Sequence, residues 1–266
     1  MEYLGLYYEF YKIKLKGIAQ YRGAFLMTTF SKAVNYLSRF VVIWIMINQF
    51  RTMGTWSAYE VLILYGLNSA SYALAGSCFY HITTYLSQLV RDGTMDEVLT
   101  KPLNPFVYLM SRFFSTGYVG TFSISIFIIL FSLIKLQIPF TLSRILFLIV
   151  SILSGGIITA AVMICCSVPA FWMVRNSAIK NLVFDMKHFV EYPITIFNKS
   201  IQFILTFVLP FAFITFFPAL VILDKQDYAF FPEWLPYLTP VVAVVLFAAA
   251  YKFWFYGLKR YDSAGS

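Results

Sequence analysis

Residues 145–171 read ILFLIVSILSGGIITAAVMICCSVPAF and contain no charged side chain. A helix needs about 20 mostly apolar residues to cross the hydrocarbon core of a bilayer, and this stretch exceeds that length. Apolar helices of soluble domains are usually shorter and carry a polar face, because one side meets water. The stretch therefore predicts a transmembrane helix.

Apolar runs of this kind recur along the chain. Hydrophobic residues make up 60% of its 266 residues and charged residues 12%, about half the charged fraction of an ordinary soluble domain. We predict an all-α integral membrane protein with a single membrane domain over residues 25–266. Its six predicted transmembrane helices are Phe25–Asn48, Val61–Tyr80, Phe106–Leu133, Ile145–Phe171, Ile201–Ile222 and Tyr237–Tyr256.

The N-terminal segment, residues 1–24, differs from these runs. Residues 3–20, YLGLYYEFYKIKLKGIAQ, mix aromatic and aliphatic side chains with three lysines. This composition is too charged to span a membrane and favours an amphipathic helix in the headgroup plane. A cytosolic helix that extends the first span is the alternative. The segment also lacks the short apolar core and small-residue cleavage site of a signal peptide.

The distribution of basic residues predicts the orientation. Lys32 and Arg39 lie within the first run, and only four of the 20 Lys and Arg residues fall on the side away from the N-terminus: Arg51, Lys135, Arg144 and Lys225. The remaining 14 lie on the N-terminal side. Cytoplasmic loops carry the excess of Lys and Arg, so both termini are predicted in the cytoplasm of a multi-pass plasma-membrane protein. This topology also explains the net charge of +8 without a nucleic-acid partner.

The acidic residues and cysteines exclude other classes. All 12 Asp and Glu residues fall in predicted loops, tails or span edges, whereas ion-coupled carriers usually bury a carboxylate in the membrane. The three cysteines lie in or beside apolar runs, which indicates reduced packing residues.

The loop RDGTMDEVLTKPLNP, residues 91–105, predicts a short cytoplasmic helix. Thr94 and Glu97 have the spacing of a capping box, and Pro102 ends a helix over residues 95–101. A helix this short is marginal in water and must dock against something. We expect it to be a coupling helix that fits a groove of a cytosolic ATPase; packing on the protein's own helices is the alternative. The residues assigned to coupling are Asp92, Gly93, Met95, Asp96, Glu97, Val98 and Leu99.

Residues 176–191 form a second amphipathic segment. Ile179, Leu182 and Met186 lie on one helical face, and Pro193 follows. The pattern predicts either a second docking element or an interfacial helix that leads into the next span.

Five further residues stand out inside the apolar runs. Pro210 and Pro218 interrupt the fifth run and predict either a flexing gate or a static kink. Arg39 shares a helix face with Lys32 and either lines a path for an anionic amphiphile or pairs within the protein. The pair Gly155–Gly156 predicts close helix packing.

The sequence carries no signature of catalysis. It has no G-x-x-x-x-G-K-[ST] phosphate loop, so ATP hydrolysis is not expected of this chain. Only two histidines are present, without an H-E-x-x-H or G-x-S-x-G motif, so no catalytic residue, metal site or cofactor is predicted.

Four stretches carry a resemblance to a known family. They are Gln20-Tyr21-Arg22, the loop from Arg91-Asp92-Gly93 to Lys101-Pro102-Leu103, the region EYPITIFNKSIQFILTFVLPFAFITFFPALVIL, and the tail Gly257, Tyr261 and Ser263-Ala264-Gly265. Together they resemble the membrane subunits of ABC type 2 exporters, particularly the branch of uncharacterised and viologen-export permeases.

The resemblance implies six spans with cytoplasmic termini and two permease subunits, identical or related, that face each other. It further implies a cytosolic ABC ATPase dimer that binds ATP and Mg and drives export of an amphiphilic, drug-like, peptide or lipid-like substrate by alternating access. A carrier or channel that works without an ATPase is the alternative function.

Overall fold

The computed structural model describes residue 12 and residues 22–50, 52–173, 177–227 and 230–262. The α-helices are α2 (Arg22–Phe50), α3 (Ala58–Arg91), α4 (Thr94–Leu99), α5 (Pro105–Arg112), α6 (Val119–Lys135), α7 (Leu142–Ser167), α8 (Ser177–Met186), α9 (Lys199–Phe203), α10 (Phe216–Leu223) and α11 (Thr239–Leu258). Short 3-10 turns lie at η1 (Thr116–Tyr118), η2 (Val168–Phe171), η3 (Lys187–Glu191), η4 (Ile194–Ile196), η6 (Pro210–Phe213) and η7 (Leu235–Leu238), and η5 (Ile204–Val208) is a π-helical turn.

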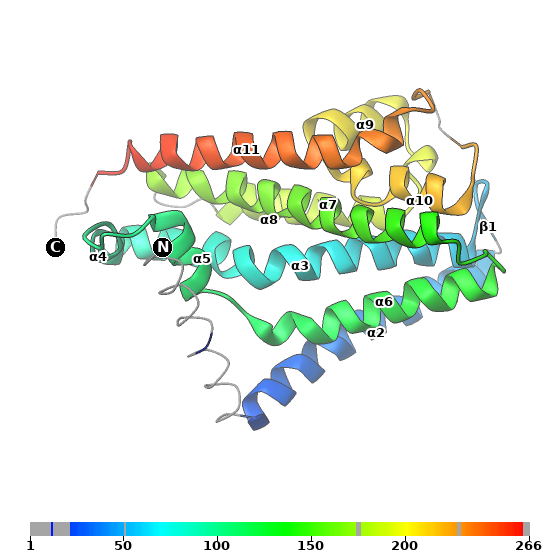
Figure 1. Ribbon diagram of the computed structural model, residues 1–266, viewed down its shortest axis with the longest axis horizontal. Coiled ribbons are helices and arrows are strands. Elements are labelled where there is room, and N and C mark those ends of the chain that lie inside the picture. The colour runs from blue at the N-terminus through cyan, green and yellow to red at the C-terminus, as the bar shows by residue number, and fades with distance from the viewer. Residues whose placement is uncertain (1–11, 13–21, 51, 174–176, 228–229, 263–266) are drawn as a thin grey trace.

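The long helices form an elongated bundle with two distinct ends (Figure 1). Strands β1 (Thr52–Met53) and β2 (Trp56–Ser57) pair as an antiparallel hairpin at one end, which we call the hairpin end. Helix α4 lies at the opposite end, which we call the α4 end. Helix α11 also finishes at the α4 end.

Helix α3 is the central element of the bundle. It packs against α6 on one side and α7 on another, and every residue from Val61 to Ser71 is buried. Close contact with α7 requires glycine, because a Cβ atom on Gly156 would lie 3.1 Å from Leu74 Cβ, and one on Gly155 would meet Ser71. The structure thus gives this glycine pair the packing role expected of small residues in membrane helices.

Four helical stretches are long and apolar enough to cross a membrane: Ala58–Arg91, Thr116–Lys135, Leu142–Phe171 and Leu235–Leu258. They contain the predicted second, fourth and sixth spans and part of the third. The predicted first span lies within α2, which has 29 residues but is not among these four. The N-terminal segment, residues 1–24, lies outside the described residues except for Lys12 and residues 22–24.

The predicted third span, Phe106–Leu133, is not continuous. Asn104 caps a separate helix, α5, by accepting hydrogen bonds from the amides of Phe106 and Val107 at 3.0 and 3.4 Å. The chain then breaks at residues 113–115, and the long helix runs from Thr116 to Lys135. The sequence prediction joined two helices because the residues between them are mostly apolar or aromatic.

After α7 the chain returns along the bundle to the hairpin end. Helix α8 begins beside the end of α7, where Ile179 and Cys165 line the same cavity. Helix α8, η3 and η4 follow one another, and Thr195 Oγ1 then donates a 3.4 Å hydrogen bond to Asp227 Oδ2 at the hairpin end. At about 1.5 Å per helical residue, residues 177–196 are long enough to cross a bilayer core.

The next segment bends back on itself. Residues 199–208 and 210–223 form two helical arms at 72° to each other. The first arm begins soon after Thr195, and the second ends next to Lys225, whose Nζ lies 2.9 Å from Glu60 Oε2 at the start of α3. Both arms therefore open at the hairpin end, and the predicted span Ile201–Ile222 is corrected to a re-entrant hairpin.

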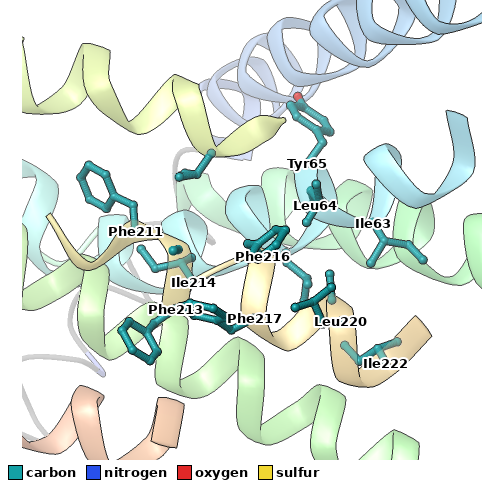
Figure 2. Packing of buried hydrophobic residues seen from close by; sticks show 14 of the residues in the cluster. Ile63, Leu64, Tyr65, Phe211, Phe213, Ile214, Phe216, Phe217, Leu220 and Ile222 are labelled. Atoms are coloured by element: carbon teal, nitrogen blue, oxygen red, sulfur yellow. The ribbon is translucent and has the colours of Figure 1, made fainter. Parts of the chain in front are cut away.

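Proline explains the bend in the re-entrant hairpin. Pro210 cannot donate a backbone hydrogen bond, and it restricts Leu209 to an extended conformation, with φ −115° and ψ 96°. The second arm is buried throughout residues 210–220. Phe216, Phe217 and their neighbours pack near Ile63, Leu64 and Tyr65 of α3, as Figure 2 shows. The tip of the hairpin thus points into the bundle.

Candidate functional site

Helix α4 and its surroundings form the first candidate site. The predicted capping box is wrong, because Gly93 is the N-cap in the left-handed region at φ 69°, and Thr94 Oγ1 donates instead to the Leu89 carbonyl at 3.3 Å. A side chain at position 93 would strain this conformation. The glycine lets the chain turn sharply from α3 into α4, which ends at Leu99 rather than at residue 101.

The apolar face of α4 packs mainly on the protein itself. Met95 and Val98 are buried and belong to a cluster with residues of α3, α5 and α11. Leu99 keeps 38% of its surface exposed, and Asp92 and Glu97 are exposed as well. Of the predicted coupling residues, these three are the ones that a partner could reach from solvent.

Polar contacts fix α4 to the rest of the α4 end. Lys101 Nζ lies 2.9 Å from Glu97 Oε1 and donates a 3.1 Å hydrogen bond to the Tyr108 hydroxyl. The hydrogen bonds raise the pKa of Lys101, and the bond and charge of Lys101 lower the pKa of Glu97. Burial and the adjacent Asp96 carboxylate raise the pKa of Tyr261. Helix α4 is therefore held against both α5 and the segment after α11.

The second predicted docking segment lies mostly in α8. Ile179 and Leu182 are exposed, at 41% and 61%, whereas Met186 packs against the main core. Ile179 lies near the α4 end, where it lines a cavity together with Cys165 of α7. The docking element and the interfacial helix both stay predictions for this segment. From α8 the chain continues toward the hairpin end through η3 and η4.

A buried polar cluster lies where the segment after α8 meets α3. Glu191 is only 8% exposed, and its Oε1 accepts a 3.5 Å hydrogen bond from Asn68 Nδ2 and lies 2.7 Å from His188 Nδ1. Lys187 is also buried, with Nζ 3.5 Å from the centre of the Tyr72 ring. The sequence analysis assigned Glu191 to a loop, and the structure corrects this by placing it inside the bundle.

The two predicted gate prolines have different positions. Pro210 lies at the bend between the arms, at the tip of the re-entrant hairpin. Pro218 lies in the first turn of α10, where a missing amide proton leaves no helical hydrogen bond unmade. Only Pro210 therefore occupies a position at which the chain direction changes.

The basic residues of α2 were the predicted candidates for a substrate path. Lys32 Nζ lies 3.5 Å from the centre of the Tyr118 ring in η1, so its ammonium group makes a cation–π contact that joins α2 to the start of the third membrane helix. Arg39 lies on α2, but its side chain is outside the described part of the chain.

An apolar cavity lies beside the tip of the re-entrant hairpin. Its volume is about 400 Å³, within the range of roughly 300–1,000 Å³ that ligand pockets occupy. The lining residues come from α7, α8, the hairpin tip and α11: Ala161, Val162, Cys165, Cys166, Ile179, Val183, Val208, Leu209, Pro210, Leu246, Ala249, Ala250 and Phe253. The sequence analysis missed this cavity because its residues come from four distant segments.

A metal-dependent site has no support in the described ranges. In residues 22–50, 52–173, 177–227 and 230–262, no group of three His, Cys, Asp or Glu side chains lies close enough to hold a metal ion.

Comparison with known protein families gives a match over most of the chain. A family model described as "ABC-2 family transporter protein" matches residues 33–265, which is most of the chain. The match is to the family as a whole and does not single out the viologen-export branch. No curated protein and no solved structure matches the chain.

Proposed function

Because the chain belongs to the ABC-2 family of transporter proteins, we propose that it is the permease subunit of an exporter driven by separate ATPase subunits. The family forms the transmembrane part of ABC transporters and not the ATPase, which agrees with the missing phosphate loop in this sequence. ATP and Mg are bound by the partner in this proposal, and the cargo is an amphiphilic, drug-like, peptide or lipid-like molecule.

The observation that carries the proposal is the attachment of α4. This helix is fixed to α3 and α5 through buried Met95 and Val98, while Leu99 remains exposed at its surface. A partner that moves the exposed face would move the ends of α3 and α11 together, because α4 packs with both. Motion of an ATPase is transmitted in this way to the membrane helices.

A six-span topology is part of the same proposal, and the path of the chain supports it. We propose crossings by α2, α3, α6, α7, residues 177–196 and α11, with the re-entrant hairpin as an additional element. The excess of basic residues assigns the α4 end to the cytoplasm, and both termini with it. Two permease chains, identical or related, face each other in this assembly.

The substrate path and gate are parts of the same proposal. Pro210 lies at the tip of the re-entrant hairpin, so a small rotation of either arm would shift the tip within the bundle. Arg39, on α2, is a candidate contact for an anionic group of the cargo. Alternating access then requires the tip to move as the ATPases close.

The buried polar cluster favours a second candidate function. Carriers that need no ATPase commonly bury charged groups inside the membrane. Glu191 and Lys187 are buried beside α3, and the partly exposed His188 lies next to Glu191. An ATPase-independent carrier or channel would use this cluster for coupling or ion passage. The experiment below distinguishes the two functions.

The test is the native mass of the complex after gentle extraction from its own membrane. The exporter proposal expects this chain together with two ATPase subunits and a second permease chain. Leu99→Asp should remove the ATPase subunits, because it places a charge on the exposed apolar side chain of α4. Thr100→Asp, which adds the same charge outside the predicted docking residues, should retain them. A chain that is isolated alone or only with itself would favour the carrier or channel.

A further inference from the structure

The cavity beside the tip of the re-entrant hairpin has no role in the proposed function. It is bounded by α7, α8, α11 and Val208–Pro210. Its wall on α7 extends from Ala161 to Cys166, in the half of that membrane helix nearer the α4 end. In the proposed orientation this is the depth of the inner leaflet.

The chemistry of the wall determines what can fill it. No charged, amide or hydroxyl side chain is among the described residues that line the cavity. A water molecule needs two to four polar partners to be stable in such a site, and these side chains supply none. A hydrocarbon group is therefore the occupant that the wall favours.

The rim of the cavity indicates the direction of entry. Ile179 and Val208 are exposed, at 41% and 63%, and Cys165 and Ala249 are exposed as well. These side chains lie on three membrane helices and the hairpin tip, at the surface of an apolar bundle. The cavity thus opens sideways, where lipid chains lie, rather than along the bundle.

We propose that the cavity holds one acyl chain of a lipid from the leaflet at the α4 end. The volume of about 400 Å³ is near the lower limit of ligand pockets, which suits a single chain. The polar headgroup stays at the membrane surface, because the wall has no group that would bind it. This inference does not depend on an ATPase partner.

The bound acyl chain would also support the tip of the re-entrant hairpin. Val208, Leu209 and Pro210 form one wall of the cavity, and the arm that leads to them exposes Phe203, Phe207 and Val208. An acyl chain would supply the dispersion contacts that this side of the tip lacks within the protein. Removal of the lipid should therefore make the tip of the re-entrant hairpin more mobile.

Two adjacent alanines on α11 give a matched test. Ala248 and Ala249 are both exposed, but only Ala249 lines the cavity. The full chain is placed in lipid nanodiscs with phosphatidylglycerol that carries a photoactivatable diazirine in one acyl chain. Ala249→Trp should lose the crosslinks to α7 and to residues 208–210, and Ala248→Trp should retain them. Equal crosslinking in the two variants would overturn the proposal.

A second measurement uses the unchanged chain, so that a folding defect cannot obscure the result. Phosphatidylglycerol added to delipidated protein should slow alkylation of Cys165 by N-ethylmaleimide and slow hydrogen exchange of residues 204–210. Unchanged rates would overturn the acyl-chain site. Loss of the lipid crosslinks when an exported amphiphile is added at low concentration before illumination would also overturn it, because the cavity would then be a cargo site.

Discussion

The indole nitrogen of Trp56 donates a 2.7 Å hydrogen bond to Asp227 Oδ2. Thr55 and Thr195 donate to the same oxygen at 2.7 and 3.4 Å, and the Trp56 side chain is fully buried. This one carboxylate therefore joins the β-hairpin, the segment after α8 and the loop that follows α10. Three segments far apart in the sequence are fixed together at the hairpin end.

Removal of this carboxylate should destabilise the hairpin end. Asp227→Ala leaves the buried Trp56 nitrogen without its acceptor, and an unpaired buried donor costs about 1–3 kcal/mol. The expected result is a lower midpoint of thermal unfolding in detergent. Glu233→Ala, which removes an exposed carboxylate from the same loop, is the control and should leave the midpoint unchanged. Equal midpoints for the two variants would contradict this role of Asp227.

The ion pair on α4 predicts a pH dependence. Lys101 lowers the pKa of Glu97, whose ordinary value is 4.5, and Glu97 raises the pKa of Lys101, whose ordinary value is 10.5. A lowered carboxyl pKa stabilises the folded state above 4.5, and this contribution is lost as the pH falls through the folded pKa. A raised lysine pKa stabilises the folded state below pH 10.5, and this contribution is lost as the pH rises through the pKa of Lys101 in the folded state.

Hydrogen exchange of residues 94–101 measures this dependence. Protection is the ratio of the intrinsic exchange rate to the measured rate at each pH. In the unchanged protein it should be constant between about pH 4.5 and 10.5 and should fall at lower pH. Glu97→Gln should show less protection at neutral pH and no further loss on acidification. A variant with the same profile as the unchanged protein would show that the pair does not hold α4.

The contact between α3 and α7 predicts a sharp response to added volume. A Cβ atom on Gly155 would meet the Ser71 side chain, with Ile214 also only 3.2 Å away. Gly155→Ala should destabilise the bundle by about 1–3 kcal/mol, as overpacking does in other cores. Gly23→Ala is the control, because nothing lies within 4 Å of its added Cβ. A comparison of detergent unfolding midpoints for the two variants decides the matter, and similar values would contradict the tight crossing.

The sequence was sufficient for the membrane class and for most of the long helices, because uncharged runs leave few alternatives to a span. It was misleading after α7. Residues 201–222 satisfy the length and hydropathy of a span, and a proline at the centre of such a run is equally compatible with a kinked helix and with a re-entrant pair. The segment that returns along the bundle, residues 177–196, carries Lys187, His188 and Glu191. Hydropathy therefore does not identify this segment as a membrane span. Its buried charged residues are explained by contacts with Asn68 and Tyr72 of α3.

The sequence predicts where the candidate docking helix α4 lies along the chain. It does not predict which of its side chains are covered by the protein and which are exposed. The spacing of Met95, Val98 and Leu99 indicates one apolar face, and nothing in that spacing tells whether the protein or a partner covers it. In the structure only part of this face is covered. Helices α3 and α5 bury Met95 and Val98, whereas Leu99 stays exposed. Such a division depends on neighbouring helices, which a pattern within one helix cannot specify.

The path of residues 196–226 gives the most decisive topological prediction. Asn198 and Gln226 flank the re-entrant hairpin and are both exposed, so single cysteines at these positions should lie on the same side of the membrane. A straight span over residues 201–222 would instead place them on opposite sides. In cells, with Cys78, Cys165 and Cys166 replaced by alanine, a membrane-impermeant maleimide should label Asn198→Cys and Gln226→Cys from outside. Lys259→Cys, at the α4 end, should be labelled only after permeabilisation. Labelling of Asn198→Cys and Gln226→Cys from different sides would restore the single span and refute the re-entrant hairpin.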